Sequence, residues 1–181
     1  MSESIHITLG VTGGIAAYKA ADLTSKLTSA GLTVHVVMTE SATRLVAPKT
    51  FQTLSRQAVT TSLWETTDWK PGHVDLGRIS QLMVIAPCTA NMIAKIAHGI
   101  ADDALSTAVL ANPAPLLIAP AMNPVMWQNP AVQENMNILH RRGVLSIGPC
   151  AGHVACGPDG VGRMAEVDDI MKKIFEVLNN Q

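Results

Sequence analysis

The sequence predicts an α/β protein with a doubly wound parallel sheet, flavodoxin-like or Rossmann-like, formed by one domain over residues 1–181. Short apolar runs rich in β-branched residues alternate with longer segments of helical periodicity, which is typical of parallel strands covered by helices on both faces. A glycine pair follows the first apolar run, as expected for a tight turn between a strand and a helix. A length of 181 residues fits a single domain with its own core.

The individual elements follow from periodicity and from glycine or proline boundaries. Strands are expected at 5–10, 32–38, 82–86, 116–119 and 144–147, where apolar residues cluster. Helices are expected at 15–29, 89–97, 103–110, 130–142 and 167–178, with a further helical stretch at 41–56 that is interrupted at Pro48. The stretches 57–72, 119–127 and 148–164 are expected to be irregular, the last because it is rich in glycine.

The composition excludes several classes of protein. A net charge of −1 gives no sign of a nucleic-acid partner or of an anionic membrane partner. No apolar run approaches the ~18 residues that cross a bilayer, and the N-terminal residues do not resemble a secretory signal. With only three cysteines, the sequence favours a cytoplasmic protein. Its 48% hydrophobic and 15% charged residues leave little polar surface, which favours a homo-oligomer.

Gly13-Gly14 marks a candidate phosphate-binding turn. Glycine permits positive φ and close backbone approach, and the N-terminus of the following helix offers free N–H groups. The pair matches neither the dinucleotide fingerprint nor a P-loop, so FMN fits better than NAD or ATP. Glu40 can mimic a ribose-binding acid, and the flanking Thr39 and Ser41 hydroxyls can bind phosphate or ribityl groups. The alternative is a tight turn without a ligand.

Polar side chains also follow two later strands. Thr89 can cap a helix, and Asn91 in its first turn can bind a ligand. Asn123 would present an amide at the crevice beyond the carboxyl ends of the strands, where ligands bind in open α/β sheets. The alternative is a loop filled by Met126 and Trp127.

Two further residues can carry chemistry. His73 can act as a general base or hydrogen-bond donor, although a single histidine is more often structural. Cys156 lies in a glycine-rich stretch, where a thiol can be delivered to a covered site; the alternative is an inert small apolar residue. Cys150, His153 and Cys156 match no standard zinc spacing, so no metal is expected.

Five motifs lie in order along almost the whole chain. They are Gly13-Gly14-Ile15-Ala16-Ala17-Tyr18-Lys19, His73, the segment 86–103, the pattern P-x-M-N-x-x-M-W over 120–127, and Ala155-Cys156-Gly157 through Gly162-Arg163-Met164. On these motifs the chain resembles the homo-oligomeric flavin-containing cysteine decarboxylases. The resemblance implies a flavodoxin-like fold, bound FMN, and an active site between the subunits of a homotrimer, which in bacteria often assembles into a dodecamer.

The same resemblance implies roles for individual residues. His73 and Cys156 are expected to be catalytic, and Asn123 is expected to bind the substrate carboxylate. The expected FMN-binding residues are Gly14, Ile15, Thr39, Ser41, Thr89, Ala90, Asn91, Met92 and Ala121.

The implied reaction is decarboxylation of 4′-phospho-N-pantothenoylcysteine to 4′-phosphopantetheine in coenzyme A biosynthesis. In this reaction flavin would oxidise the cysteine side chain of the substrate to a thioaldehyde, with assistance from His73. CO2 would then leave to give an enethiol, and reduced flavin together with a proton from Cys156 would reduce the enethiol to the product. The Ala155-Cys156-Gly157 motif, which the peptidyl-cysteine decarboxylases of lantibiotic maturation generally lack, favours this reaction over theirs. Two further functions compete with it: a non-enzymatic flavin-binding regulatory subunit and a nicotinamide-dependent oxidoreductase. Many bacterial relatives are fused to a phosphopantothenate–cysteine ligase, so we expect a separate ligase partner unless the sequence is part of a longer chain.

Overall fold

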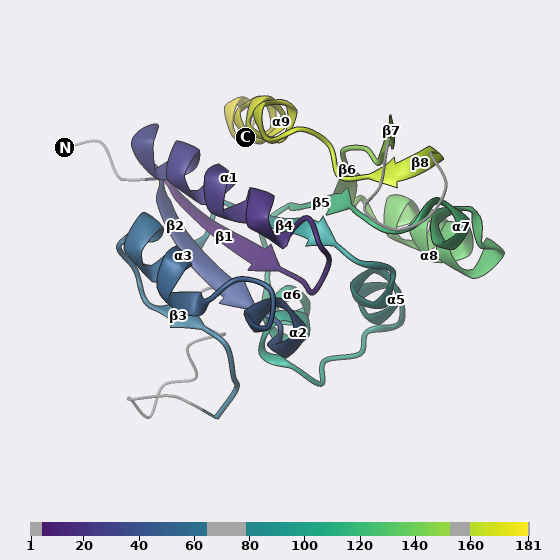
Figure 1. The fold of residues 1–181 in the computed structure, drawn as a ribbon, viewed down its shortest axis with the longest axis horizontal. Helices are drawn as coiled ribbons and strands as arrows, with labels where there is room; N and C mark the ends of the chain where they lie inside the picture. The colour runs from purple at the N-terminus through teal and green to yellow at the C-terminus, as the bar shows by residue number, and fades with distance from the viewer. Residues whose placement is uncertain (1–4, 65–78, 153–159, 181) are drawn as a thin grey trace.

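Six parallel strands form the centre of the protein. The computed structural model describes residues 5–64, 79–152 and 160–180. The strands are β1 (His6–Val11), β2 (Thr33–Met38), β3 (Val59–Thr60), β4 (Leu82–Cys88), β5 (Leu116–Pro120) and β6 (Leu145–Ser146). Their order is β3-β2-β1-β4-β5-β6, the order of Rossmann-type sheets (Figure 1). The predicted doubly wound parallel sheet is confirmed.

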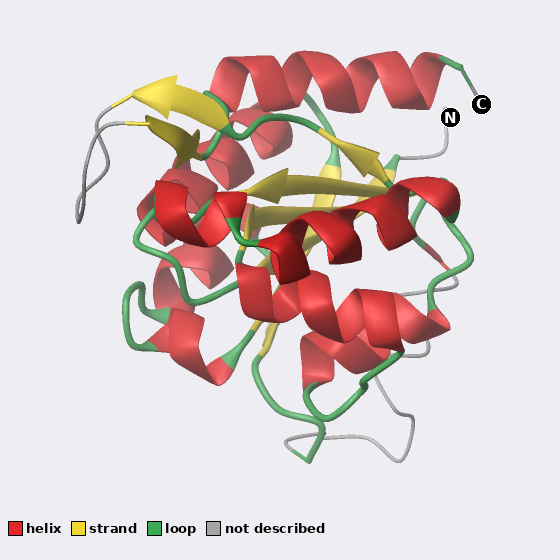
Figure 2. Cartoon of the chain, turned by 90° about the vertical axis from the view of Figure 1, so that its right-hand side faces the viewer, coloured by secondary structure: helices red, strands yellow, loops and turns green. Residues whose placement is uncertain are grey.

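Helices cover both faces of this sheet (Figure 2). One apolar cluster joins the sheet to α1 (Ala17–Ser29), α3 (Pro48–Ser55) and α9 (Val167–Asn179). A second cluster joins the opposite face to α5 (Ala90–His98), α6 (Ala104–Ala111) and α8 (Pro130–Arg141). Because helices exclude water from both faces, β4 is buried at every position, which explains why its sequence is a continuous apolar run.

The predicted interruption at Pro48 is confirmed. The stretch 41–56 forms α2 (Glu40–Thr43) and α3, and Pro48 occupies the first turn of α3. A proline is tolerated there because its missing N–H would have no partner within the helix. The other predicted helices and strands are found with boundaries that shift by a few residues.

Three stretches expected to be irregular contain regular structure instead. Asn123 and Pro124 were expected in a loop, but they begin the short helix α7 (Pro124–Gln128), because an Asn-Pro pair provides both a cap and a first helical residue. The glycine-rich stretch 148–164 contains β7 (Cys150–Gly152), which pairs antiparallel with β8 (Gly160–Arg163). Within 57–72, β3 adds a short edge strand beside β2.

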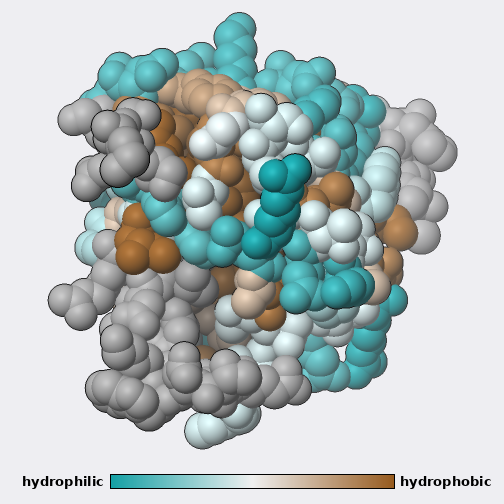
Figure 3. Space-filling view, turned by 90° about the vertical axis from the view of Figure 1, so that its left-hand side faces the viewer, coloured by the Kyte–Doolittle hydropathy of each residue, from teal (hydrophilic) through white to brown (hydrophobic). Residues whose placement is uncertain are grey.

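The surface is mixed in character. Apolar atoms reach it between hydrophilic ones on the face at the left of Figure 1, as Figure 3 shows. Several large apolar side chains are exposed, among them Ile15, Tyr18, Leu110 and Val125. In the part of the chain that the structure describes, no helix has the length and apolar character needed to span a membrane.

Candidate functional site

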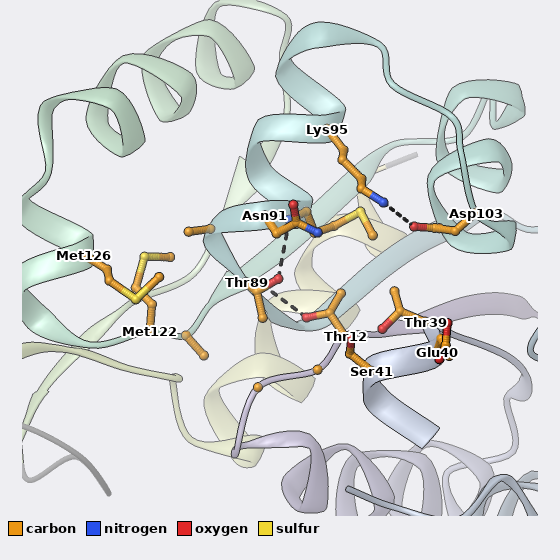
Figure 4. Close-up of a pocket in the computed structure, with 15 residues that line it drawn as sticks. Thr12, Thr39, Glu40, Ser41, Thr89, Asn91, Lys95, Asp103, Met122 and Met126 are labelled. Carbon is orange, nitrogen blue, oxygen red and sulfur yellow. Dashed lines mark hydrogen bonds and ion pairs between the residues drawn. The ribbon is translucent and has the colours of Figure 1, made fainter. Parts of the chain in front are cut away.

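A pocket of about 530 Å³ opens where β1, β2, β4 and β5 end (Figure 4). The connections from β1 and β4 leave the sheet in opposite directions, and ligands of open α/β sheets bind at such a switch point. The residues that line the pocket are Thr12, Gly13, Gly14, Thr39, Glu40, Ser41, Thr89, Ala90, Asn91, Met92, Lys95, Asp103, Ala121, Met122 and Met126.

The glycine turn lies in close contact with two other segments that line this pocket. A Cβ on Gly13 would lie 2.3 Å from the Cβ of Ser41, and a Cβ on Gly14 would lie 3.4 Å from the Cγ2 of Thr89. Neither glycine has a positive φ, so of the two properties that glycine permits, the turn uses close backbone approach. Gly13 is required because the turn approaches Ser41 too closely for any side chain.

Capped helices begin beside the glycine turn. The Oγ1 of Thr89 accepts a hydrogen bond from the Met92 N–H at 3.4 Å, so Thr89 caps α5 as predicted. The Oγ1 of Thr39 accepts one from the Ala42 N–H at 3.3 Å and caps α2. The first turn of α5 presents Asn91 to the pocket. The positive end of a helix dipole and a closely approaching backbone together favour a negatively charged ligand group.

A lysine with two carboxylate partners forms the far wall of the pocket. The Nζ of Lys95 lies 2.5 Å from the Oδ1 of Asp102 and 2.6 Å from the Oδ2 of Asp103. Burial disfavours the charged lysine, but hydrogen bonds to the two carboxylates outweigh burial and raise the pKa of Lys95. Burial would likewise raise the pKa of Asp103, but hydrogen bonds from Lys95 and Ser106 hold that pKa below its usual value. Lys95 and Asp103 are therefore charged at neutral pH.

Asn123 lies next to the pocket lining. Its Oδ1 accepts the Val125 N–H at 2.8 Å, so it caps α7. The preceding Met122 contributes to the pocket, and its N–H donates to the carbonyl oxygen of Gly162 at 2.9 Å. A Cβ on Gly162 would lie 2.3 Å from the Met122 carbonyl oxygen. Strand β8 is thus held closely against the segment that carries Asn123.

The pocket brings together all the predicted FMN-binding residues except Ile15, which is 65% exposed and does not line the pocket. Whether these residues bind FMN stays a prediction. His73 and Cys156 lie outside the described residues.

Three polar residues of the pocket were not predicted from the sequence: Thr12, Lys95 and Asp103. Lys95 is four positions after Asn91 in α5, so helical periodicity already places both on one face. Asp103 could have been recognised as an N-cap at the start of a predicted helix, and its side chain indeed accepts the Ser106 N–H. For Thr12, its place directly before the glycine pair was the only signal.

Comparison with known proteins assigns the family. The model of the family described as Flavoprotein matches residues 1–179. The chain belongs to the Flavoprotein family. The coenzyme A biosynthesis bifunctional protein CoaBC of Bacillus subtilis (strain 168) is 48% identical over 173 residues, which are 95% of this chain and 43% of that protein. The chain therefore spans less than half the length of this curated relative.

Solved structures of two decarboxylases share the fold. The FMN-dependent cysteine decarboxylase SpaF has a TM-score of 0.84 and 31% identity, with 96% of this chain and 97% of that chain covered. A cysteine-to-serine mutant of a PPC decarboxylase, complexed with pantothenoylaminoethenethiol, has a TM-score of 0.86 and 30% identity over 98% of this chain and 100% of that one. Together with the family model, these two structures confirm the family resemblance inferred from the motifs.

Proposed function

We propose that this chain is an FMN-dependent enzyme that decarboxylates 4′-phospho-N-pantothenoylcysteine to 4′-phosphopantetheine in coenzyme A biosynthesis. The observation that carries the proposal is the pocket at the switch point, where a side-chain-free turn and the N-terminus of α5 meet. The names of the relatives, a coenzyme A biosynthesis protein and a PPC decarboxylase, support the substrate. Residues 1–181 would form one FMN-binding domain.

The pocket fits FMN in size and in chemistry. A volume of about 530 Å³ lies within the range of sites for ligands of this size. Gly13 and Gly14 place a backbone without side chains in the pocket wall beside Ser41 and Thr89, so a phosphate could approach the N–H groups of the turn closely. Thr39, Ala90, Asn91, Met92 and Ala121 supply hydroxyl, amide and backbone groups together with an apolar wall for a planar ring.

Decarboxylation of an amido acid needs an electron sink, because the carbanion left by CO2 is otherwise unstable. Bound FMN would create that sink by oxidising a substrate carbon–sulfur centre by two electrons, which it would later return. We propose that the His73 imidazole assists the oxidative half as base or by orienting the thiol, that the Asn123 amide holds the carboxylate, and that the Cys156 Sγ donates the final proton. The relative solved with an enethiol carries a serine in place of a cysteine, which supports a proton-donor cysteine.

We propose that a second subunit of a homotrimer completes the active site. Measurement of the molecular mass in solution distinguishes this trimer from a dodecamer. Apolar side chains are exposed on both sides of the pocket: Ile15 and Tyr18 follow the glycine turn, and Val125 and Met126 belong to α7. Such side chains are typical of a surface that another subunit covers. A ligase partner, either separate or on the same longer chain, and a cytoplasmic location belong to the same proposal.

Incubation of the FMN-loaded protein with 4′-phospho-N-pantothenoylcysteine tests this function. We expect a yellow protein and, by mass spectrometry, a product that has lost CO2. Cys156→Ser should accumulate the enethiol with reduced flavin, whereas the matched control Cys150→Ser, at a residue that does not line the pocket, should turn over normally. A colourless protein, unchanged substrate, or normal turnover by Cys156→Ser would contradict the proposal. Decarboxylation of a peptide with a C-terminal cysteine in preference to this substrate would favour a role in lantibiotic maturation.

A further inference from the structure

We propose that Thr12 is a positioning residue, whose buried hydroxyl fixes the distance between the glycine turn and the N-terminus of α5. This inference rests on the proposed function, because both segments would bind parts of the same FMN molecule. It assigns to Thr12 a role in preorganising the pocket rather than in the chemistry.

The geometry shows where the hydroxyl acts. Strands β1 and β4 are paired in regular parallel register only as far as Gly10 and Ile85. Beyond these residues the Oγ1 of Thr12 donates to the carbonyl oxygen of Pro87 at 2.7 Å. The same oxygen accepts the N–H of Thr89 at 3.2 Å (Figure 4). One side chain therefore connects the two chain segments where the backbone ladder has stopped.

This connection joins the two segments expected to bind FMN. On one side, the Gly14 N–H donates to the carbonyl oxygen of Thr12 at 2.8 Å, so the glycine turn is built on Thr12. On the other side, Thr89 caps α5 through Met92. A continuous series of hydrogen bonds thus runs from the turn, through Thr12, to the first turn of α5.

Thr12 is well suited to this task. It is 1% exposed, and its hydroxyl uses both its donor and an acceptor position on backbone groups of the other segment. A hydroxyl offers a donor and an acceptor on one small atom, and the β-branch of threonine restricts χ1. Replacement by valine would keep the shape but leave the Pro87 carbonyl and the Thr89 N–H without this partner.

The test compares FMN dissociation constants of the full chain and three variants, each measured below its own unfolding temperature. Thr12→Val should weaken FMN binding by about 10- to 100-fold, since two buried groups lose their partner and the two segments move independently. Thr12→Ser, which keeps the hydroxyl, should restore binding to within about threefold of the original protein. Thr24→Val is the matched control: Thr24 is equally buried and donates to the Ala20 carbonyl oxygen at 2.7 Å, but it does not line the pocket.

The outcomes separate this inference from the proposed function. If the original protein binds FMN and Thr12→Val binds it equally well, or loses no more affinity than Thr24→Val, the role of Thr12 is refuted while the proposed function stands. If the original protein does not bind FMN, both fall. A stability defect alone would lower the unfolding temperature of apo Thr12→Val without changing the dissociation constant, and this result would also overturn the inference. If Thr12→Val does not fold, Thr12→Cys, with a weaker hydrogen-bonding group, is measured with the same expectations.

Discussion

Gly13→Ala tests the idea that close approach, rather than backbone conformation, requires glycine in the turn. An alanine Cβ at this position would lie 2.3 Å from the Cβ of Ser41, 3.0 Å from its carbonyl carbon and 3.2 Å from its Cα. These atoms belong to the backbone or are attached directly to it, so no side-chain rotation relieves the clash. Because carbon atoms pack at about 3.5–4.0 Å, the turn and α2 must separate by more than about 1 Å.

The cost follows from this displacement. Overpacking costs about 1–3 kcal/mol, and the reduced freedom of the unfolded chain returns about 0.4–1 kcal/mol. The middle of these ranges gives a net loss of about 1–2 kcal/mol, which corresponds to a fall in melting temperature of about 2–8 °C for a protein of this size. FMN affinity should also fall by about tenfold or more, because the turn no longer approaches Ser41 in the native geometry.

Thermal unfolding of the apo protein and FMN titration measure these two effects. Gly14→Ala is the neighbouring control for stability, since its Cβ would meet the nearest atom, the Thr89 Cγ2, at an ordinary 3.4 Å. We expect the melting temperature of apo Gly14→Ala to equal or slightly exceed that of the original protein. The argument is refuted if apo Gly13→Ala melts no lower than apo Gly14→Ala.

Three further predictions concern the surroundings of the pocket. Asp103→Ala should lower the free energy of unfolding by about 1–2 kcal/mol, because the protein loses both a helix cap and a partner of Lys95. Asp102→Ala removes a more exposed carboxylate and should cost less, and urea denaturation of the two variants measures the difference. Gly162→Ala should displace β8 from the Met122 carbonyl oxygen, raise the KM for substrate and lower the stability of the apo protein by about 1–3 kcal/mol. An unchanged KM would contradict the idea that this close approach shapes the substrate site. Burial is the main cause that lowers the pKa of His35, and the neighbouring His6 lowers it further. The unfolded state therefore binds more protons, and the free energy of unfolding should decrease as the pH falls below about 6.5. Melting curves from about pH 8 to 5.5 should show this decrease, and it should be shallower for His35→Gln.

Local sequence patterns predicted most of the sheet and its helices because each element carries its own signal. The run Leu82–Ala86 is apolar throughout because β4 is covered on both faces, and Pro48 marks a helix start because its ring fits the first turn. The prediction from sequence failed where one residue pattern occurs in two kinds of local structure. Asn123-Pro124 is found in loops and at helix starts, and the glycines of 148–164 suggested a loop although β7 and β8 pair there.

The sequence by itself determined the doubly wound fold, the family and a set of pocket residues that lie together at one edge of the sheet. It could do so because periodicity, glycine turns and ordered motifs are local properties of the chain. Only the tertiary structure decided why Gly13 must be glycine, that Lys95 is held by Asp102 and Asp103, and that Thr12 connects β1 to β4. These are contacts between segments that lie far apart along the chain or on separate elements. Their distances depend on how strands and helices pack, which no local pattern specifies.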